Sequence, residues 1–502
     1  MTELLQHLHL GFSTALSLNN GLYCLLGCVL GTAVGVLPGL GPVPTIAMLL
    51  PITYSLPPVT ALIMLAGIYY GTQYGGSTTS ILVNLPGESS SVVTCIDGYQ
   101  MARKGRAGAA LSISALGSFF AGTVGTFIIA GFGPVLAEVA FKFGPAEYFS
   151  LMVLGLLGAV TLAHGSPVKA IAMIVLGILL GLVGTDVNSG VERYSLGIPE
   201  LADGINFVVV AMGLFAFAEI IKNLEQTGEK REVFTGNVKN WFLTKEERKE
   251  AIPAVLRGTT VGCTLGILPG GGAILASFAA YAFEKRMSKH PEKFGTGAIA
   301  GVAAPESANN GAAQTSFIPM LVLGLPGNAT MALMAGAMTI HNIQPGPQVM
   351  SSNPALFWGL VCSMWIGNLM LVVLNLPLIG MWIKFLKIPY RLMFPAIMMF
   401  CVIGVFSLSN NTMDVLISIP FALLGYVFTK LECEPAPLLL GFVLGPMMEE
   451  NFTRAMLLSR GNLSAFVTRP VSLGLLIAAC ALLVVMVLPN IRKKREEVFV
   501  EG

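Results

Sequence analysis

One apolar stretch of the chain occurs twice, and this repetition limits the possible folds more than any other feature. GTAVGVLPGLG at 31–41 and GCTLGILPGGG at 262–272 share six glycine, leucine and proline positions at an offset of 231 (262 minus 31). Proline removes an amide donor, and glycine loosens the helical preference of the backbone. An unpaired peptide group in lipid costs several kcal/mol, so each break is expected to line a cavity. Matched interruptions in two halves of a membrane chain are typical of a transporter's binding site.

The composition places the chain in a bilayer. Of its 502 residues, 54% are hydrophobic and 11% are charged, whereas about a quarter of the residues of a soluble protein are charged. Apolar runs of about 17–25 residues recur from end to end, and each can cross a membrane as a helix. We therefore expect an all-α polytopic membrane protein with about 10–12 membrane segments. The net charge of +2 arises from a few local clusters, which indicate topology rather than a nucleic-acid surface.

The lysine and arginine clusters assign the sides of the membrane. Cytoplasmic loops are expected at 98–108, 224–250 and 284–294, where these residues gather. No lysine or arginine precedes Arg103 and none occurs in 341–354, so the N-terminus and that loop are expected outside. The two copies of the break then begin on opposite sides, which predicts an inverted repeat.

Each half is expected to contain a hairpin and an interrupted run. The first half, 1–240, has the hairpin at 21–51 and the run at 60–97; the second, 241–502, has the hairpin at 258–284 and the run at 296–340. Hairpin arms of about a dozen residues reach only halfway across a bilayer, so both hairpins are expected to be re-entrant. Glycine and Thr-Ser positions of the runs align at an offset of 236, but LPG at 85–87 and 325–327 aligns at 240. This difference predicts about one inserted helical turn.

Further spans follow in both halves. They are expected near 109–133, 147–163, 167–185, 207–223, 355–380, 392–408, 415–429 and 471–489. A short apolar run at 435–448 precedes the last of them, and arginines flank that last span on both sides. We expect the C-terminal basic cluster at 492–495 in the cytoplasm and 449–470 at the interface or outside.

Polar side chains gather in the two interrupted runs without any lysine or arginine. An anionic substrate would therefore be held by helix N-termini and by hydroxyl and amide donors. The candidate substrate-binding residues are Ser77, Thr78, Thr79, Ser80, Asn84, Asn309, Asn310, Gln314, Thr315 and Ser316. Ser89, Ser90 and Ser91 lie in the same zone. Small polar residues also serve close helix packing in membranes, and for any single residue that alternative stays open.

The breaks also free carbonyl oxygens, which are hard ligands that suit sodium. The candidate cation ligands are Pro38, Gly39, Gly41, Pro269, Gly270, Gly272 and Glu306. Carrying a dianion inward against 100 mV costs about 4.6 kcal/mol, which favours co-transport of sodium or possibly protons. Glu306 could couple the cation, or it could lie near the interface and cap a helix. Glu88 and Asp97 are expected near the cytoplasmic boundary. The five histidines form no cluster, so sodium is the only metal expected and no other cofactor is.

Several longer motifs resemble a known family. They are GVLPGLGP (35–42), YGG through LPG (74–87), DGYQMARKGR (97–106), FGPAEYF (143–149), DGINF (203–207), LPGGG (268–272), APESANN (304–310) and SFIP (316–319). In this order they are similar to the large permease subunit of tripartite tricarboxylate transporters. The turn after Pro269 lacks a second proline like Pro42, so the two hairpins are chemically unequal.

The resemblance implies a bacterial inner-membrane permease that works with a small four-helix membrane subunit and a periplasmic solute-binding protein. It also implies sodium-coupled uptake of citrate or a related di- or tricarboxylate, and an elevator-like carrier. A stand-alone ion-coupled carboxylate symporter without a binding protein is the alternative. A membrane-embedded enzyme or a channel is disfavoured, because the sequence shows neither a catalytic cluster nor a ring of charged pore residues.

Overall fold

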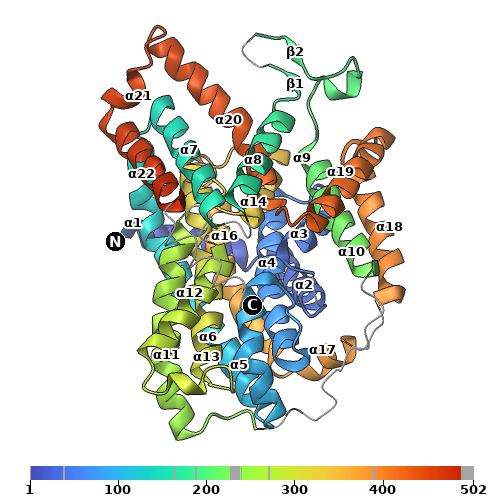
Figure 1. Cartoon of the computed structure of the whole chain (residues 1–502), viewed down its shortest axis with the longest axis vertical. Helices are drawn as coiled ribbons and strands as arrows, with labels where there is room; N and C mark the ends of the chain where they lie inside the picture. Colours follow the sequence, from blue (N-terminus) through green and yellow to red (C-terminus); the bar gives the residue numbers. More distant parts are fainter. Residues whose placement is uncertain are drawn as a thin grey trace.

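The computed structural model describes residues 2–37, 40–162, 166–186, 189–225, 238, 240–268, 272–386 and 390–487. These residues are almost entirely helical, and their one sheet is the short antiparallel pair β1 (Gly184–Thr185) and β2 (Glu192–Arg193) (Figure 1). Five of the described helices are long and apolar enough to cross a membrane: Leu18–Gly35, Ala107–Ala140, Phe207–Glu225, Pro354–Asn375 and Thr412–Lys430. The expected all-α polytopic fold is confirmed.

The helices of the first half are α1 (Thr2–Ala15), α2 (Leu18–Gly35), α3 (Pro42–Thr53), α4 (Pro58–Val83), α5 (Val92–Arg103), α6 (Ala107–Ala140), α7 (Pro145–Leu162), α8 (Pro167–Gly181), α9 (Phe207–Ala211) and α10 (Ala218–Glu225). Those of the second half are α11 (Lys245–Ile267), α12 (Gly272–Met287), α13 (Ala300–Thr315), α14 (Ala329–Ile340), α15 (Gln348–Ser352), α16 (Pro354–Asn375), α17 (Ile379–Phe385), α18 (Tyr390–Ser409), α19 (Thr412–Lys430), α20 (Ala436–Leu458), α21 (Ala465–Thr468) and α22 (Pro470–Val487). Short 3₁₀ turns lie at Ser89–Ser91, Pro199–Leu201 and Pro291–Lys293, and π-helical segments at Met212–Phe217 and Pro319–Leu323.

In the first half, α2 and α4 lie side by side and run in the same direction. A Cβ added at Gly27, Gly31 or Gly35 would overlap the backbone of α4 at Met64, Ile68 or Thr72, respectively. Small residues at every fourth position let membrane helices approach this closely. Because the residue numbers rise together along both helices, the chain must return through α3 before α4 begins. Asn20 and Thr60, which lie at the starts of α2 and α4, share a hydrogen bond of 2.6 Å.

The second half repeats this arrangement. Gly258, Gly262 and Gly266 of α11 lie against Ala304, Ala308 and Ala312 of α13, so these two helices are also parallel and α12 returns the chain. The helix pairs α2–α3 and α11–α12 thus occupy the ranges predicted for the two hairpins, and their re-entrant character stays a prediction. Their first arms have 18 and 23 residues rather than about a dozen. The reason is local: Ser17 caps α2, and a capping box at Thr244 starts α11 within the polar segment that precedes the apolar run.

The two halves point in opposite directions. Helix α6 runs parallel to α13, with Gly117 beside Ser307 and Gly125 beside Gln314. It runs antiparallel to α16, with Gly122 beside Asn368 and Gly133 beside Phe357. In turn α16 is parallel to α4, with Gly359 beside Val59 and Gly367 beside Tyr70. It follows that α4 and α13 are antiparallel, which is the relation that an inverted repeat requires.

Both interrupted runs are broken at equivalent positions. Helix α4 ends before Asn84, and the π segment after α13 ends before Gly324; each of these residues has a left-handed backbone, with φ of 58° and 73°. The pair lies at the predicted offset of 240. The extra turn is the π segment that begins at Pro319, which has no amide to continue the regular ladder. The prediction of one inserted turn is confirmed.

The three loops expected in the cytoplasm meet at one end of the molecule. Arg106 pairs with Glu247, Lys293 lies 3.3 Å from Glu250, and Lys104 donates to a backbone carbonyl of the 295–298 loop. The β-strands lie at the opposite end (Figure 1). There Arg193 binds Glu449 at 2.6 Å, so the segment after 448 lies with the β-strands. Helix α20 continues to Leu458 instead of ending near 448.

Candidate transport site

The site is built on α4 and α13, which are covered on all sides. Residues 60–83 of α4 and all sixteen residues of α13 are buried. A helix that is buried all round is normally apolar all round, yet both carry the predicted serines, threonines and amides. These polar groups must be satisfied within the protein, because lipid offers them no partner.

Glu306 is 1% exposed and lies in the second turn of α13. Its carboxylate accepts hydrogen bonds from Ser77 Oγ of α4 (2.5 Å), Ser114 Oγ of α6 (3.0 Å) and Thr94 Oγ1 of α5. Glu306 therefore lies inside α13 and caps no helix, so the predicted capping alternative is wrong, whereas its position relative to the membrane interface stays a prediction. Pro305 beside it sits inside α13 rather than at its start, which the sequence alone did not reveal.

Glu88 is a second buried carboxylate, 5% exposed, and it begins the 3₁₀ turn at Ser89–Ser91. It accepts hydrogen bonds from Asn309 Nδ2 (3.0 Å) and from Ser90 Oγ. Its Cβ lies 3.5 Å from the position of a Cβ on Gly41, at the tip of the first hairpin. Glu88 is thus packed inside the protein, and its expected position near the cytoplasmic boundary stays a prediction. The run of three serines after it resembles a solvated loop but folds against α13.

Gln73 joins the two halves, and sequence reasoning missed it. It lies at the same repeat position as Asn309 (offset 236), and the two side chains meet. In the orientation that its neighbouring acceptors require, the Gln73 amide donates to Asn309 Oδ1 (2.8 Å) and to Glu88 Oε2 (2.9 Å). The equivalence of positions 73 and 309 at this offset was the signal that could have found it. The pseudo-twofold axis of the repeat passes close to this contact.

The other predicted residues divide into three groups. Asn310 donates to Ser118 Oγ (2.7 Å) and to the Glu306 carbonyl, and Ser80 binds Ser91 at 2.9 Å, so both belong to the buried network. Thr79 and Thr315, which are equivalent in the repeat, donate to hairpin carbonyls at Val36 (2.6 Å) and Cys263 (3.1 Å). They fasten each hairpin to its interrupted helix.

The third group of predicted residues makes no described hydrogen bond to either buried carboxylate. Thr78 and Ser316 bond to carbonyls of their own helices, and Asn84 is the left-handed residue after α4. Gln314 is buried with its Oε1 lacking a hydrogen-bond partner within the described part of the chain. Among the predicted cation ligands, Gly41 lies beside Glu88 and Gly272 begins α12 with φ of 47°. Pro38, Gly39, Pro269 and Gly270 lie outside the described residues.

Asp97 fixes the position of two helices that carry the site. It is fully buried, and its Oδ1 accepts from the backbone amides of Gly295, Gly297 and Ala298 at 2.7–2.9 Å. Tyr281 donates to Oδ2 at 3.0 Å. This contact joins α5 to the segment that leads into α13, at the end of the molecule where the basic loops gather. It fixes the helix that carries Thr94 against the one that carries Glu306.

All the hydrogen bonds described for the two carboxylates come from neutral hydroxyl or amide groups. The described residues contain no group of three or more histidine, cysteine or acidic side chains that could hold a metal ion. The arrangement is thus two carboxylates surrounded by hydroxyl and amide groups at the crossing of two broken helices. Oxygen ligands of this kind suit a hard monovalent cation or a proton rather than a transition metal.

The comparisons with known proteins agree with the architecture. A family model described as the tripartite tricarboxylate transporter TctA family matches residues 22–440. The chain is 59% identical over its whole length, and over the whole of the relative, to an Agrobacterium vitis protein called "Uncharacterized 52.8 kDa protein in TAR-I ttuC' 3'region". A second Agrobacterium vitis protein, from the TAR-II ttuC' 3'region, is 58% identical over 240 residues, which cover 48% of this chain and 99% of that protein. No solved structure matches the chain significantly. On this similarity and on its repeated architecture, the chain belongs to the tripartite tricarboxylate transporter TctA family.

Proposed function

We propose that this permease imports citrate or a related di- or tricarboxylate in symport with sodium across a bacterial inner membrane. It receives the substrate from a periplasmic solute-binding protein and works with a small four-helix membrane subunit. Membership in a family of tripartite transporters supports the two partners and the carboxylate class. The observation that carries the proposal is the pair of buried carboxylates, Glu88 and Glu306, where the broken helices of opposite halves meet.

The buried carboxylates argue for a cation. A charge deep in a membrane protein costs several kcal/mol unless it is paired, and the hydrogen bonds described here come from neutral groups. A cation bound between Glu88, Glu306 and the hairpin carbonyls offsets this cost. It also removes the repulsion that an anionic substrate would meet beside two carboxylates. Substrate and cation therefore bind together, which is the physical requirement for symport.

The substrate is assigned to the neutral donors. Ser77, Asn309 and Asn310 lie beside the carboxylates, and the helix starts after the two breaks supply oriented amides. The helix pairs α2–α4 and α11–α13 pack through glycines in the same way. Each pair leads into one hairpin tip and one helix break. An elevator-like movement of these pairs against the remaining spans would expose the site to each side in turn.

The test is uptake of labelled citrate and of other di- and tricarboxylates into proteoliposomes. The vesicles contain the chain and the small subunit, and the binding protein is added outside. We expect uptake that requires an inward sodium gradient and the binding protein, and that falls at least about ten-fold in Glu306→Gln. Full-rate uptake by the chain alone would support a stand-alone symporter instead, and uptake that does not respond to sodium would remove sodium as the coupling ion.

A further inference from the structure

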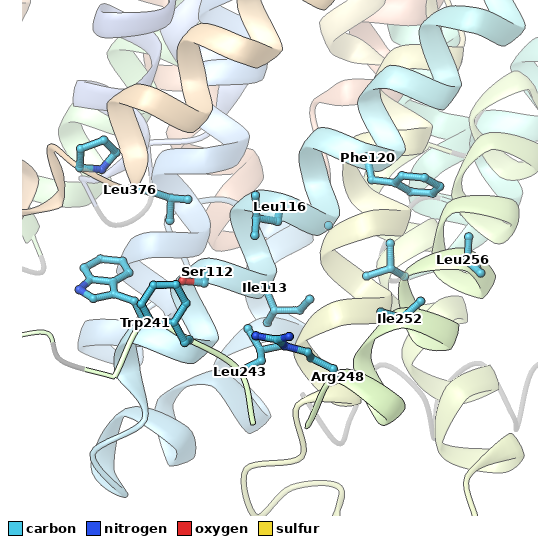
Figure 2. Close-up of a pocket in the computed structure, with 14 residues that line it drawn as sticks. Ser112, Ile113, Leu116, Phe120, Trp241, Leu243, Arg248, Ile252, Leu256 and Leu376 are labelled. Carbon is cyan, nitrogen blue, oxygen red and sulfur yellow. The ribbon is translucent and has the colours of Figure 1, made fainter. Parts of the chain in front are cut away.

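A groove on the outer surface of α6 and α11 has no part in the site described above. Its volume is about 800 Å³, and it lies between these helices, the segment 241–243 that precedes α11 and the end of α16 at Leu376 and Pro377. Figure 2 shows aliphatic and aromatic side chains around it and Arg248 at its lower edge. The groove is thus apolar along its walls and positively charged at one end.

The walls of the groove are apolar and exposed. Leu116 and Phe120 of α6 are 48% and 39% exposed, and Ile252 and Leu256 of α11 are 58% and 50% exposed. Helix α6 is one of the described helices long and apolar enough to cross a membrane. Exposed aliphatic groups on such a helix contact hydrocarbon, so a lipid chain can enter the groove sideways from the bilayer.

The charged end of the groove lies at the end of the molecule that carries the basic loops and is predicted to face the cytoplasm. Arg248 is near the start of α11, at the end of the molecule where the basic loops gather. Two basic residues of these loops are paired, Arg106 with Glu247 and Lys293 with Glu250. Within the described residues no ion pair is formed by Arg248 itself. Trp241, on the same edge, is a residue typical of the membrane–water interface.

We propose that this groove binds a phospholipid with an anionic head group, with an acyl chain along α6 and α11 and the phosphate at Arg248. Basic pockets between membrane helices on the cytoplasmic side are known to select such head groups. A helix of a partner subunit could also fill an apolar groove, but an apolar helix would leave the Arg248 charge unmatched. The charge therefore favours a lipid over a protein helix. Gly117 lines the groove and also contacts Ser307 of α13, so the lipid would lie directly behind the transport site.

The test uses the full chain in nanodiscs of phosphatidylcholine alone or with an equal part of phosphatidylglycerol. Binding is measured by native mass spectrometry of retained lipid and by the thermal shift that phosphatidylglycerol produces. We expect selective retention of phosphatidylglycerol, and about five-fold weaker retention in Arg248→Gln, the loss expected for one basic residue at the surface. Lys249→Gln, a neighbouring exposed residue that does not line the groove, is the matched control and should retain the lipid.

A second variant tests the apolar part. Ile252→Trp fills the groove without changing charge and should reduce retention of both lipids, while the thermal stability in detergent stays close to that of the unchanged chain. Equal retention of the two lipids, or equal loss in Arg248→Gln and Lys249→Gln, would overturn the proposal. Loss of small-subunit binding in Ile252→Trp without a change in lipid retention would assign the groove to a protein helix instead.

Discussion

At the first break of this permease, the residue that begins the next helical segment is Glu88; at the equivalent position of the second break it is Asn328. Both residues cap the segment that follows, Glu88 at the turn before α5 and Asn328 by accepting from the amide of Met331 at 2.9 Å. The two capping geometries serve the same structural purpose. Only the first places an acidic side chain in the protein interior, so the backbone is repeated while the chemistry is not.

The carboxylate of the second half lies elsewhere. Glu306 sits on α13, and the residue at its repeat position in the first half is Tyr70, whose hydroxyl has no hydrogen-bond partner in the described part of the chain. Each half thus contributes one carboxylate from a different repeat position, Glu88 bound to Asn309 and Glu306 bound to Ser77 of the opposite half. A symmetric scaffold carrying an asymmetric site suits a carrier that must alternate between two sides while binding a single set of ligands.

The largest effect is expected where the halves are most alike. Gly31→Leu and Gly262→Leu should both abolish folded protein, because a side chain at either position would overlap the backbone of the parallel helix. Gly131→Leu, where no atom lies within 4 Å, is the control and should leave the protein intact. Size-exclusion chromatography of the detergent-solubilised protein measures this. If one of the first two variants stays folded, the hairpins are not equivalent in packing.

The next effect should separate the two breaks. Glu88→Gln is expected to lower cation-coupled uptake about ten- to a hundred-fold, because the carboxylate makes charge-assisted bonds that an amide cannot replace. Asn328→Ser keeps a good helix cap and should retain most of the uptake. Initial rates of carboxylate uptake at several sodium concentrations, normalised to the amount of protein, provide the comparison. Equal losses in both variants would mean that the charge at position 88 is not what distinguishes the halves.

A smaller effect is expected within the buried network. Asn310→Ala removes a donor that binds both Ser118 and the Glu306 carbonyl, whereas Ser80→Ala removes one bond between two hydroxyls. We expect uptake to fall about ten-fold in the first and about two- to five-fold in the second, with protein levels unchanged. Thr78→Ala, whose hydroxyl bonds only to its own helix in the described contacts, is a matched control. Unaltered uptake in both Asn310→Ala and Ser80→Ala would remove these residues from the site.

The sequence predicted those features that depend on local chemistry. Glycine and proline indicate breaks in an apolar run, so the repeat and an inserted turn between Ser316 and Leu325 could be predicted, but not that the turn begins at Pro319. Lysine and arginine in a loop favour the cytoplasmic side whatever the rest of the fold, and the three basic loops do meet at one end of the molecule. The lengths of the first hairpin arms, α2 and α11, were underestimated, because the caps at Ser17 and Thr244 start these helices before the apolar runs begin.

The composition of the site was only partly predictable, because it depends on packing between distant segments. Thr94, Ser114 and Ser118 come from helices that look like ordinary small-residue spans, and their hydroxyls matter only because α5 and α6 pack against α13. Glu88 is followed by serines that suggest a solvated loop. No local pattern shows that the first break folds back onto Asn309. The repeat offset does predict the Gln73–Asn309 relation, since equivalent residues near a twofold axis meet.

The smallest effect is expected at the end that carries the β-strands, where Arg193 of the first half binds Glu449 of the second at 2.6 Å and lies 3.7 Å from Asp186. The hydrogen bond to Glu449 raises the pKa of Arg193 above its usual value, so the contribution of the Arg193 charge to stability is fully present at neutral pH and is lost as the pH rises past the arginine pKa. Both side chains are partly exposed, and such pairs contribute less than about 1 kcal/mol.

In a thermal-unfolding cycle of Arg193→Gln, Glu449→Gln and the double variant near neutral pH, we expect a coupling free energy below that value and unchanged uptake. The i,i+4 pair of Arg454 and Glu450 within α20 is the matched control, since it joins no two halves. A loss of uptake in Arg193→Gln but not in Arg454→Gln would show that this outer contact between the halves takes part in transport.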